Sequence, residues 1–428
     1  FLIVSTTLFA QPKNGIVSGP WAGNVELRNA SIWVEVTPNV KAVAVNYTMA
    51  GGIPQLKKYT GELGKDFNPL KIELNGLEMN KTYSYTVLID GKPIKTNYPT
   101  QFTTKELWQF RKPAPDFSFL TGSCSYFNEP VFDRPGKPYG GDSSIFETMA
   151  NTPANFHLWL GDNWYTREVD YFTPWGLIYR ASRDRSLPIL QKFWASMPQY
   201  AIWDDHDFGW NDADKSYPFK ETSREVFKTF WSNPSYGENN QGIYSKFTWN
   251  DVDVFLLDDR WFRSNDEMPD SLNGKANENK RMYGKQQMEW LKNALLQSNG
   301  NGSINFRIIA TGSQVLNPMS PYDCFRHFSL EYKELMDFLT ETKINGIVFL
   351  TGDRHHSEVI KSERPNAYAL YDITSSPLTS GSHKFGGPEK NNPYRVAGID
   401  NIQYYSKISF SGTRKDRKMK VEFIDTKG

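Results

Sequence analysis

The sequence predicts an α/β protein in which a layered α/β domain follows a small all-β sandwich. Three observations support this prediction. The first hundred or so residues alternate apolar and polar side chains with a period of two, as in strands buried on one face. Beyond about residue 114, short continuous apolar runs alternate with amphipathic helical stretches, a pattern typical of a buried sheet covered by helices. Several of these runs end directly on residues that bind metals or phosphate, so the second domain is expected to hold the functional site.

The sandwich is expected to span residues 17–106. Four runs with period-two alternation read as strands, and Asp90-Gly91 is a strong signal for a hairpin turn. The runs are 31–36, 42–47, 71–74 and 83–89. No cluster of ionisable residues lies in this segment, which indicates an accessory module.

Residues 1–12 resemble the remnant of a signal peptide, because an apolar stretch ends in Leu8-Phe9-Ala10-Gln11. This predicts an extracytoplasmic protein, periplasmic or secreted. The alternative is an ordinary N-terminal strand. No later segment is long and apolar enough to predict a transmembrane anchor in the mature chain.

The composition narrows the possible classes of function. The chain has 428 residues and a net charge of +1, without a clustered basic face, so a nucleic-acid-binding surface is not expected. Two cysteines, Cys124 and Cys324, exclude a disulfide framework, although a single bridge stays open. The 13 Trp residues fit either a large core or an aromatic rim around a cleft. We expect a monomer that binds small molecules.

The layered domain is expected to span residues 114–428, after the junction Pro113-Ala114-Pro115-Asp116. Helices are predicted over 283–298 and 328–343, where apolar residues recur at helical spacing. The stretches 125–139 and 166–197 are expected to form the walls of a cleft.

Five apolar runs of this domain end on polar side chains. In sheets of this kind, ligands bind beyond the carboxyl ends of the strands, so chain-distant clusters should converge there. Each run is followed by its own candidates: 117–120 by Cys124, 156–160 by Asp162 and Tyr165, and 201–203 by Asp204, Asp205 and His206. The run 254–257 is followed by Arg260, and the run 347–350 by Asp353, His355 and His356. The pattern predicts an enzyme with a metal centre.

The residue types indicate which ions would bind. Asp162 can bridge two cations while the phenolate of Tyr165 binds one of them, although an Asp after a strand can also form a turn or cap a helix. A phenolate and a thiolate from Cys124 suit Fe³⁺ better than Mg²⁺. Asp204 and Asp205 should point to opposite faces, so one of them faces the site. His206 is a candidate ligand, general acid or phosphate donor.

Two further residues could contact the substrate or orient water. Arg260 offers a planar pair of donors for two phosphate oxygens, and its alternative is a salt bridge to a nearby Asp. Gln314 ends another apolar run, 306–310, where its amide could bind a metal weakly or orient a water.

Taken in order, these motifs resemble the PhoD-type alkaline phosphatases and phosphodiesterases. They are the strings Gly-Ser-Cys-Ser, Gly-Asp-Asn-Trp-Tyr, Trp-Asp-Asp-His-Asp, Leu-Asp-Asp-Arg-Trp-Phe-Arg, Gly-Ser-Gln-Val and Thr-Gly-Asp-Arg-His-His-Ser. That family belongs to the calcineurin-like metallophosphoesterases and is related to purple acid phosphatases. The resemblance implies an αββα-type core, a metal-dependent hydrolase of phosphate mono- or diesters, and a role in extracytoplasmic phosphate scavenging.

The resemblance also implies metals and ligands. Fe³⁺ would be bound by Cys124, Asp162, Tyr165 and Asp353 or His355. One or more Ca²⁺ would be bound by Asp162, Asp205 and His356 or His355, with zinc or manganese as alternatives.

Catalytic and supporting roles follow from the same resemblance. His206 and Arg260 would stabilise charge or protonate the leaving oxygen. Substrate-binding or supporting roles would fall to Asn163, Asp204, Asn211, Gln314 and Arg354. This chain has Asp207 where the family usually has Glu, which leaves Asn211 in doubt as a ligand.

Three other functions stay open. A protein of the same fold could act on phosphotriesters or another substrate, or it could bind ligands without catalysis. A third possibility is a cysteine hydrolase that uses Cys124 with His206 or His355.

Overall fold

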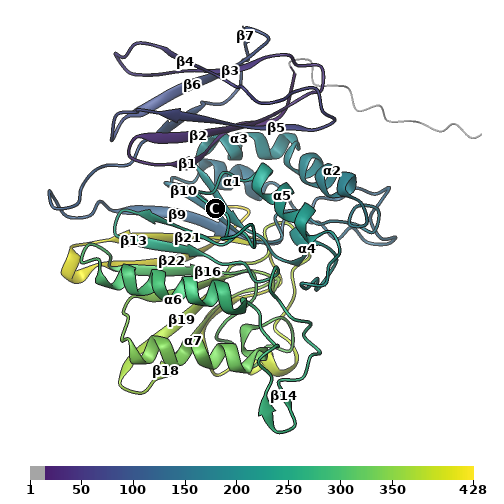
Figure 1. Cartoon of the computed structure of the whole chain (residues 1–428), viewed down its shortest axis with the longest axis vertical. Coiled ribbons are helices and arrows are strands. Elements are labelled where there is room, and N and C mark those ends of the chain that lie inside the picture. The colour runs from purple at the N-terminus through teal and green to yellow at the C-terminus, as the bar shows by residue number, and fades with distance from the viewer. Residues whose placement is uncertain (1–14) are drawn as a thin grey trace, which may run out of the picture.

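A computed structural model describes residues 15–428, so the predicted signal-peptide remnant at residues 1–12 lies outside the described residues. The first eight strands form two antiparallel sheets around a core of their own (Figure 1). One sheet has the order β1-β2-β5, and the other has the order β4-β3-β6-β7 with β8 paired to β6. Their bounds are β1 Ile16–Val25, β2 Asn29–Val36, β3 Val43–Met49, β4 Gln55–Lys58, β5 Asn68–Asn75, β6 Thr82–Ile89, β7 Lys92–Pro93 and β8 Gln101–Thr103.

The local patterns that predicted this sandwich are present in the structure. Exposed and buried residues alternate along β6, as period-two patterning requires. Asp90 and Gly91 join β6 to β7 with φ angles of +49° and +80°, the left-handed conformations of a tight hairpin turn. The boundary between residues 106 and 114 stays a prediction, and it falls in the connection between β8 and β9.

The rest of the chain forms two sheets that pack face to face, with helices outside them (Figure 1). One sheet has the order β11-β10-β9-β21-β22, and the other has the order β12-β13-β16-β17-β19-β18-β20. The strands are β9 Phe117–Gly122, β10 Phe156–Leu160, β11 Gln199–Ile202, β12 Ser245–Trp249, β13 Val252–Leu256, β16 Phe306–Ala310, β17 Ile347–Thr351, β18 Ser357–Arg364, β19 Ala367–Thr374, β20 Arg395–Ile399, β21 Tyr404–Ser411 and β22 Lys418–Asp425. This is the layered α/β architecture that the sequence predicts.

Helices cover both outer faces of the paired sheets. The helices on the side of the sandwich are α1 Ile145–Asn151, α2 Pro174–Arg185, α3 Pro188–Ser196, α4 Asp205–Phe208 and α5 Lys220–Phe230. On the far side lie α6 Gly284–Gly300 and α7 Ser329–Glu341, which confirm the two helices predicted at these positions within two residues at each end. A small hairpin, β14 Ser271–Leu272 with β15 Lys275–Ala276, and three short 3-10 helices, η1 Phe325–His327, η2 Gly387–Asn391 and η3 Arg414–Asp416, complete the described elements.

The second sheet shows why its strands read as continuous apolar runs. Val254, Ile308 and Val348 point into the core between the two sheets. Their neighbours Phe255, Ile309 and Phe349 point the other way, into the core beneath α6 and α7. Both faces of each strand are therefore apolar.

Parallel pairing aligns the strands that lead to the predicted site. β9, β10 and β11 run parallel in the first sheet, and β13, β16, β17 and β19 run parallel in the second. Their carboxyl ends consequently lie at one edge of the molecule, where the polar residues follow. Among residues 15–428, none of the helices is long and apolar enough to cross a membrane.

Candidate metal centre

Four residues at the ends of these strands have backbone conformations that non-glycine residues rarely adopt. The φ angles are +61° at Cys124, +51° at Asp162, +65° at Asp353 and +55° at His355. Such conformations cost free energy, and they cluster at functional sites where the surrounding structure enforces them. Four residues that the sequence singles out as ligands therefore have left-handed backbone conformations.

The first donor cluster consists of Cys124, Asp162 and His355. Their side chains are buried, and one ligand atom from each lies within 4.8 Å of the other two. Cys124 Sγ lies 3.6 Å from Asp162 Oδ2. The hydroxyl of Tyr165 lies 3.2 Å from His355 Nε2, so a phenolate borders the same cluster. The cluster offers sulfur, oxygen and nitrogen ligands to one cation.

A second donor cluster shares Asp162 with the first. Asp162, Asp205 and His206 each place a ligand atom within 4.8 Å of the others. The backbone N–H of His206 donates to Asp162 Oδ1 at 3.3 Å, which fixes the second oxygen of the shared carboxylate. A carboxylate placed between two donor sets can bridge two cations. The two clusters are therefore candidate ligand sets for two cations.

Burial and the crowding of acidic groups disfavour the charged forms of the side chains in this site. Burial, together with the nearby Asp205 and Cys124, raises the pKa of Asp162 well above its usual range. Burial raises the pKa of the Cys124 thiol to about 12. Asp205 Oδ1 and His206 Nδ1 are buried and have no hydrogen-bond partner among the described residues. Because such groups are costly to bury unless a cation or a donor meets them, the residues present fit metal ions.

A cavity of about 1320 Å³ opens over both clusters. Asp162, Asp205, His206, Asp353 and His355 line it, so the donor groups face a space large enough for a substrate. Burial, with Asp323 nearby, raises the pKa of Asp353 to about 7. The backbone oxygen of Asp353 lies 3.6 Å from Cys124 Sγ, which ties the end of β17 to the end of β9.

The short helix α4 presents Asp205 and His206. Asp207, which is in α4, accepts hydrogen bonds from the backbone N–H of Asp204 at 3.0 Å and of Asn163 at 2.9 Å. One buried carboxylate therefore connects the start of α4 to the loop that carries Asp162. Asp207 is a structural support of both clusters.

Comparison with known proteins identifies the family. Residues 119–404 match the model of the PhoD-like phosphatase family. The chain belongs to the PhoD-like phosphatase family.

Individual relatives agree with this assignment. Alkaline phosphatase D of Bacillus subtilis (strain 168) is 25% identical over 386 residues, which cover 77% of this chain and 62% of that protein. The chain therefore spans less than two thirds of the length of this curated relative.

Two solved structures share the fold of this PhoD-like chain. A structure of PhoD matches with a TM-score of 0.72 and 17% identity, covering 97% of this chain and 91% of that one. A purple acid phosphatase from yellow lupin (Lupinus luteus) seeds matches with a TM-score of 0.65 and 10% identity, covering 98% of this chain and 73% of that one. The metallophosphoesterase fold predicted from the sequence is thereby confirmed.

The structure does not place Arg260 where a phosphate could reach it. Its side chain is fully buried, and its guanidinium is paired with Asp204 and, at 2.7 Å, with Asp323. Arg260 is not one of the described residues that line the cavity. The expected contact with substrate is therefore replaced by the alternative, a salt bridge, and Asp204 faces Arg260 rather than the metal clusters.

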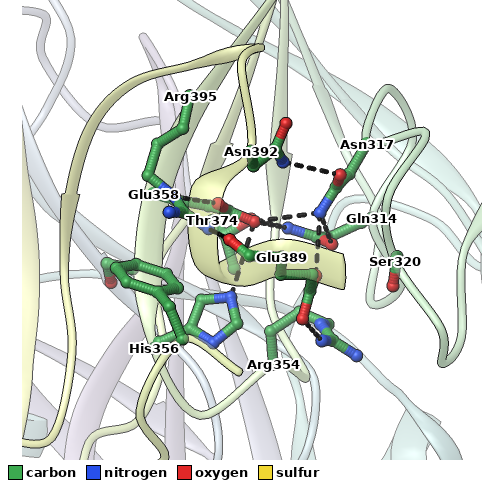
Figure 2. A network of polar contacts seen from close by, with 12 residues as sticks. Gln314, Asn317, Ser320, Arg354, His356, Glu358, Thr374, Glu389, Asn392 and Arg395 are labelled. Carbon is green, nitrogen blue, oxygen red and sulfur yellow. Dashed lines mark hydrogen bonds and ion pairs between the residues drawn. The ribbon is translucent and has the colours of Figure 1, made fainter. Parts of the chain in front are cut away.

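His356 and Gln314 also lie outside the two donor clusters. His356 turns toward Glu358, whose Oε1 lies 3.4 Å from His356 Nε2. Gln314 donates to Glu358 Oε1 at 2.8 Å and to Thr374 Oγ1 at 2.9 Å (Figure 2). Both belong to a buried polar network, and His355 is the one of the two histidines that joins Cys124 and Asp162. Both histidines line the cavity, but their ligand atoms belong to different donor groups.

The remaining predicted residues are divided between the cavity and its support. Asn211 and Arg354 line the cavity. Asn163 does not, and its side-chain amide donates to the backbone oxygen of Ile202 at 2.8 Å. Asn211 donates to Asp212 at 2.6 Å, and the N–H of Asp212 donates to Asp205 Oδ2 at 2.7 Å, so Asn211 is connected to the second cluster through Asp212.

Of the two stretches predicted to form the walls of the cavity, 125–139 contributes Tyr139 to its lining. The stretch 166–197 is mainly α2 and α3, and none of its residues, all of them described, lines the cavity. Trp164, Trp203 and Trp261 are buried in the core. The abundant Trp residues therefore serve chiefly the core.

Several residues at the site escaped the sequence prediction. Ser376 Oγ lies 3.1 Å from Cys124 Sγ, and the hydroxyl of Tyr139 lies 3.0 Å from His355 Nδ1. Ser376 follows the end of β19, so the strand-end rule that found Cys124 would also have found it. Tyr139 and Asp323 lie on loops without such a signal. Arg263 and Arg260 hold the pKa of the Asp323 carboxyl below its usual range, although the group is buried.

Proposed function

We propose that this chain is a metal-dependent phosphoesterase that hydrolyses phosphate mono- or diesters at a dinuclear centre. The observation that carries the proposal is the position of Asp162 between two buried donor sets that open onto one cavity. Membership in the PhoD-like family supports the same reaction class. When bound by the two donor sets, cations would supply Lewis-acid chemistry that polarises a phosphoryl group and activates water.

The donor types support different ions in the two positions. The thiol of Cys124 and the phenol of Tyr165 favour Fe³⁺ in the first cluster. The second cluster has two carboxylates and one imidazole. This set is less selective than the first cluster, because it fits Ca²⁺ as well as zinc or manganese. We propose one iron in the first cluster and calcium in the second. In this arrangement His206 is a metal ligand rather than a general acid.

The rival reading, a hydrolase with Cys124 as nucleophile, has little support in the geometry. Cys124 is fully buried, and burial raises its pKa to about 12, so it is a thiol that substrate does not reach. We also propose an extracytoplasmic role in phosphate scavenging and a monomeric state, both on the sequence alone.

The decisive experiment combines metal analysis with a substrate panel. The purified holoenzyme should contain iron, should be coloured by charge transfer from phenolate or thiolate, and should lose ester hydrolysis when a chelator removes the metals. A monoester, a diester and a triester of one chromogenic alcohol would rank the substrate classes. Full activity in a metal-free preparation, or hydrolysis of none of the three esters by the metal-loaded protein, would overturn the proposal.

A further inference from the structure

A buried network of charged and amide side chains (Figure 2) reaches the cavity, because Arg354, His356 and Glu389 line it. Its acidic members are Glu358 on β18 and Glu389 on η2. One amide, Asn317 Nδ2, donates to both, at 3.1 Å to Glu358 Oε1 and at 3.0 Å to Glu389 Oε1. The two carboxylates are thus close neighbours with the same burial and a shared donor.

The two carboxylates differ in the arginine that each one holds. Glu358 Oε2 accepts from Arg395 Nε at 2.7 Å, and Glu389 Oε2 accepts from Arg354 Nη2 at 2.6 Å. His356, Glu358 and Glu389 also have ligand atoms within 4.8 Å of one another. Because two arginines already balance both carboxylates, a further cation there would meet two positive charges, and we assign no metal to this network.

Arg354 is the member of the network that connects it to the metal centre. It lies between Asp353 and His355 in the sequence, and its side chain lines the cavity although only 7% of the residue is exposed. Its guanidinium carbon lies 4.8 Å from the centre of the Tyr322 ring, on which it stacks. Glu389 and Tyr322 therefore hold the guanidinium from two directions.

Arg354 also keeps donors that the network does not use. Glu389 occupies Nη2, whereas Nε is buried without a hydrogen-bond partner among residues 15–428. The other cavity cations are less suited to bind a phosphoryl group: Lys280 is paired with Asp270 at 3.3 Å, and Lys384 is exposed. A guanidinium that is already immobilised loses little freedom when it binds an anion.

We propose that Glu389 is a positioning residue that holds Arg354 on the cavity wall, where Arg354 binds a phosphoryl oxygen of the substrate. The proposal rests on the proposed phosphoesterase function. In this proposal Arg354, and not Arg260, is the arginine that contacts the phosphate. Within the buried network, only the pair of Glu389 and Arg354 has a role in recognition.

The test compares Glu389→Gln with Glu358→Gln in metal-loaded protein. Inorganic phosphate is the probe, both as a competitive inhibitor of ester hydrolysis and in direct calorimetric titration. We expect Glu389→Gln to weaken phosphate binding and lower kcat/KM by about 10-fold or more, with metal content unchanged. Glu358→Gln removes an equally buried carboxylate that holds Arg395 instead, so it should lower Tm and leave phosphate binding unchanged.

A double-mutant cycle shows whether Glu389 acts through Arg354. In an Arg354→Gln background, Glu389→Gln should have no further effect on phosphate binding, because its partner is already gone. Tyr322→Leu is a second test of how Arg354 is positioned, and it changes an exposed ring, so it can be used even if Glu389→Gln does not fold. It should weaken phosphate binding by about 2- to 5-fold, because the guanidinium of Arg354 loses the ring beneath it.

Three outcomes would overturn the inference. They are unchanged phosphate binding in Glu389→Gln, an equal loss of phosphate affinity in Glu358→Gln, and additive losses of affinity in the variant that carries both Arg354→Gln and Glu389→Gln. If Glu389→Gln does not fold, unchanged phosphate binding in Tyr322→Leu would overturn the inference instead. If phosphate binding depends on Glu389 but the wild-type protein hydrolyses no ester, the proposed function fails, whereas the positioning of Arg354 by Glu389 for anion binding is retained.

Discussion

Cys124 shows at the scale of one residue how burial and metal binding oppose each other. Burial raises its pKa to about 12, so the side chain alone is a neutral thiol. A metal ion that binds the sulfur must displace the proton, which makes binding dependent on pH. The other cysteine, Cys324, is equally buried but donates to the backbone oxygen of Asn317 at 3.4 Å. Both are free cysteines, so no bridge joins them in the described chain.

We expect Cys124→Ser to lose iron and ester hydrolysis together, by at least about 10- to 100-fold, because a serine hydroxyl does not replace a thiolate ligand. Elemental analysis and kcat/KM on the same preparation measure both. Cys324→Ser is the matched control, and it should keep metal and activity. Full iron content in Cys124→Ser would remove Cys124 from the ligands.

Arg260 leads to a different prediction from that of a substrate-binding arginine. Arg260→Lys keeps the charge but cannot pair with Asp204 and Asp323 in the same geometry. We expect a loss of stability of about 3 kcal/mol, as for a broken buried ion pair, with a much smaller change in kcat/KM. Urea unfolding and steady-state kinetics measure the two quantities. Arg354→Lys should show the reverse pattern, and strongly reduced kcat/KM with unchanged stability in Arg260→Lys would return Arg260 to the site.

At the scale of an element, α4 is notable because four residues position half of the metal centre. Helices this short have little stability of their own, so the contacts at the ends decide their geometry. Asp207 supplies those contacts by accepting from the N–H groups of Asp204 and Asn163. The side chain thereby sets the distance between Asp162 and Asp205.

Asp207→Ala should weaken metal binding by about 10- to 100-fold, although Asp207 is not a ligand, because α4 and the Asp162 loop would no longer be connected. Metal titration of the apoprotein measures the effect. Asp207→Glu restores a carboxylate and should recover part of the affinity. Equal metal affinity in the wild type and in Asp207→Ala would show that the position of α4 does not depend on this residue.

At the scale of the whole molecule, the sandwich lies against the helices of the layered domain (Figure 1), and buried side chains join the two parts. The guanidinium of Arg185, at the end of α2, lies 4.1 Å from the ring centre of Trp231, 4.4 Å from that of Trp194 and 5.0 Å from that of Trp33. Trp33 comes from β2, so rings of both parts enclose one cation. Ser182 donates to Glu35 on β2 at 2.6 Å. Burial raises the pKa of Glu35 from 4.5 to about 7.

This interface should make stability depend on pH. Between pH 4.5 and about 7, folded Glu35 holds a proton that the unfolded chain releases, so stability from this group falls as pH rises through that window. Glu35→Gln cannot ionise and should gain up to about 3 kcal/mol relative to the wild type across the window. Urea unfolding at several pH values measures the difference. A stability difference that does not vary with pH would show that Glu35 is ionised in the folded protein.

Local patterns were sufficient to predict the fold class and to single out residues that the structure brings together at the candidate site. Period-two alternation predicted the sandwich strands, and the continuous runs that end at Leu160 and Leu350 predicted strands buried on both faces. The strand-end rule then found Cys124, Asp162 and His355, because the carboxyl ends of parallel strands meet at one edge. These inferences need only the neighbours of each residue along the chain and the general geometry of sheets.

The sequence by itself determined the order of the elements, the family motifs and the chemistry offered at the strand ends. Only the tertiary structure decided which side chains meet: His355 rather than His356 joins Cys124, and Arg260 pairs with Asp204 and Asp323 instead of facing the cavity. The physical reason is that side-chain direction depends on left-handed turns and on partners far apart in the chain. Asp323, on a loop, and Glu389, on the short helix η2, lie in segments whose positions are set by packing, and no local periodicity encodes such contacts.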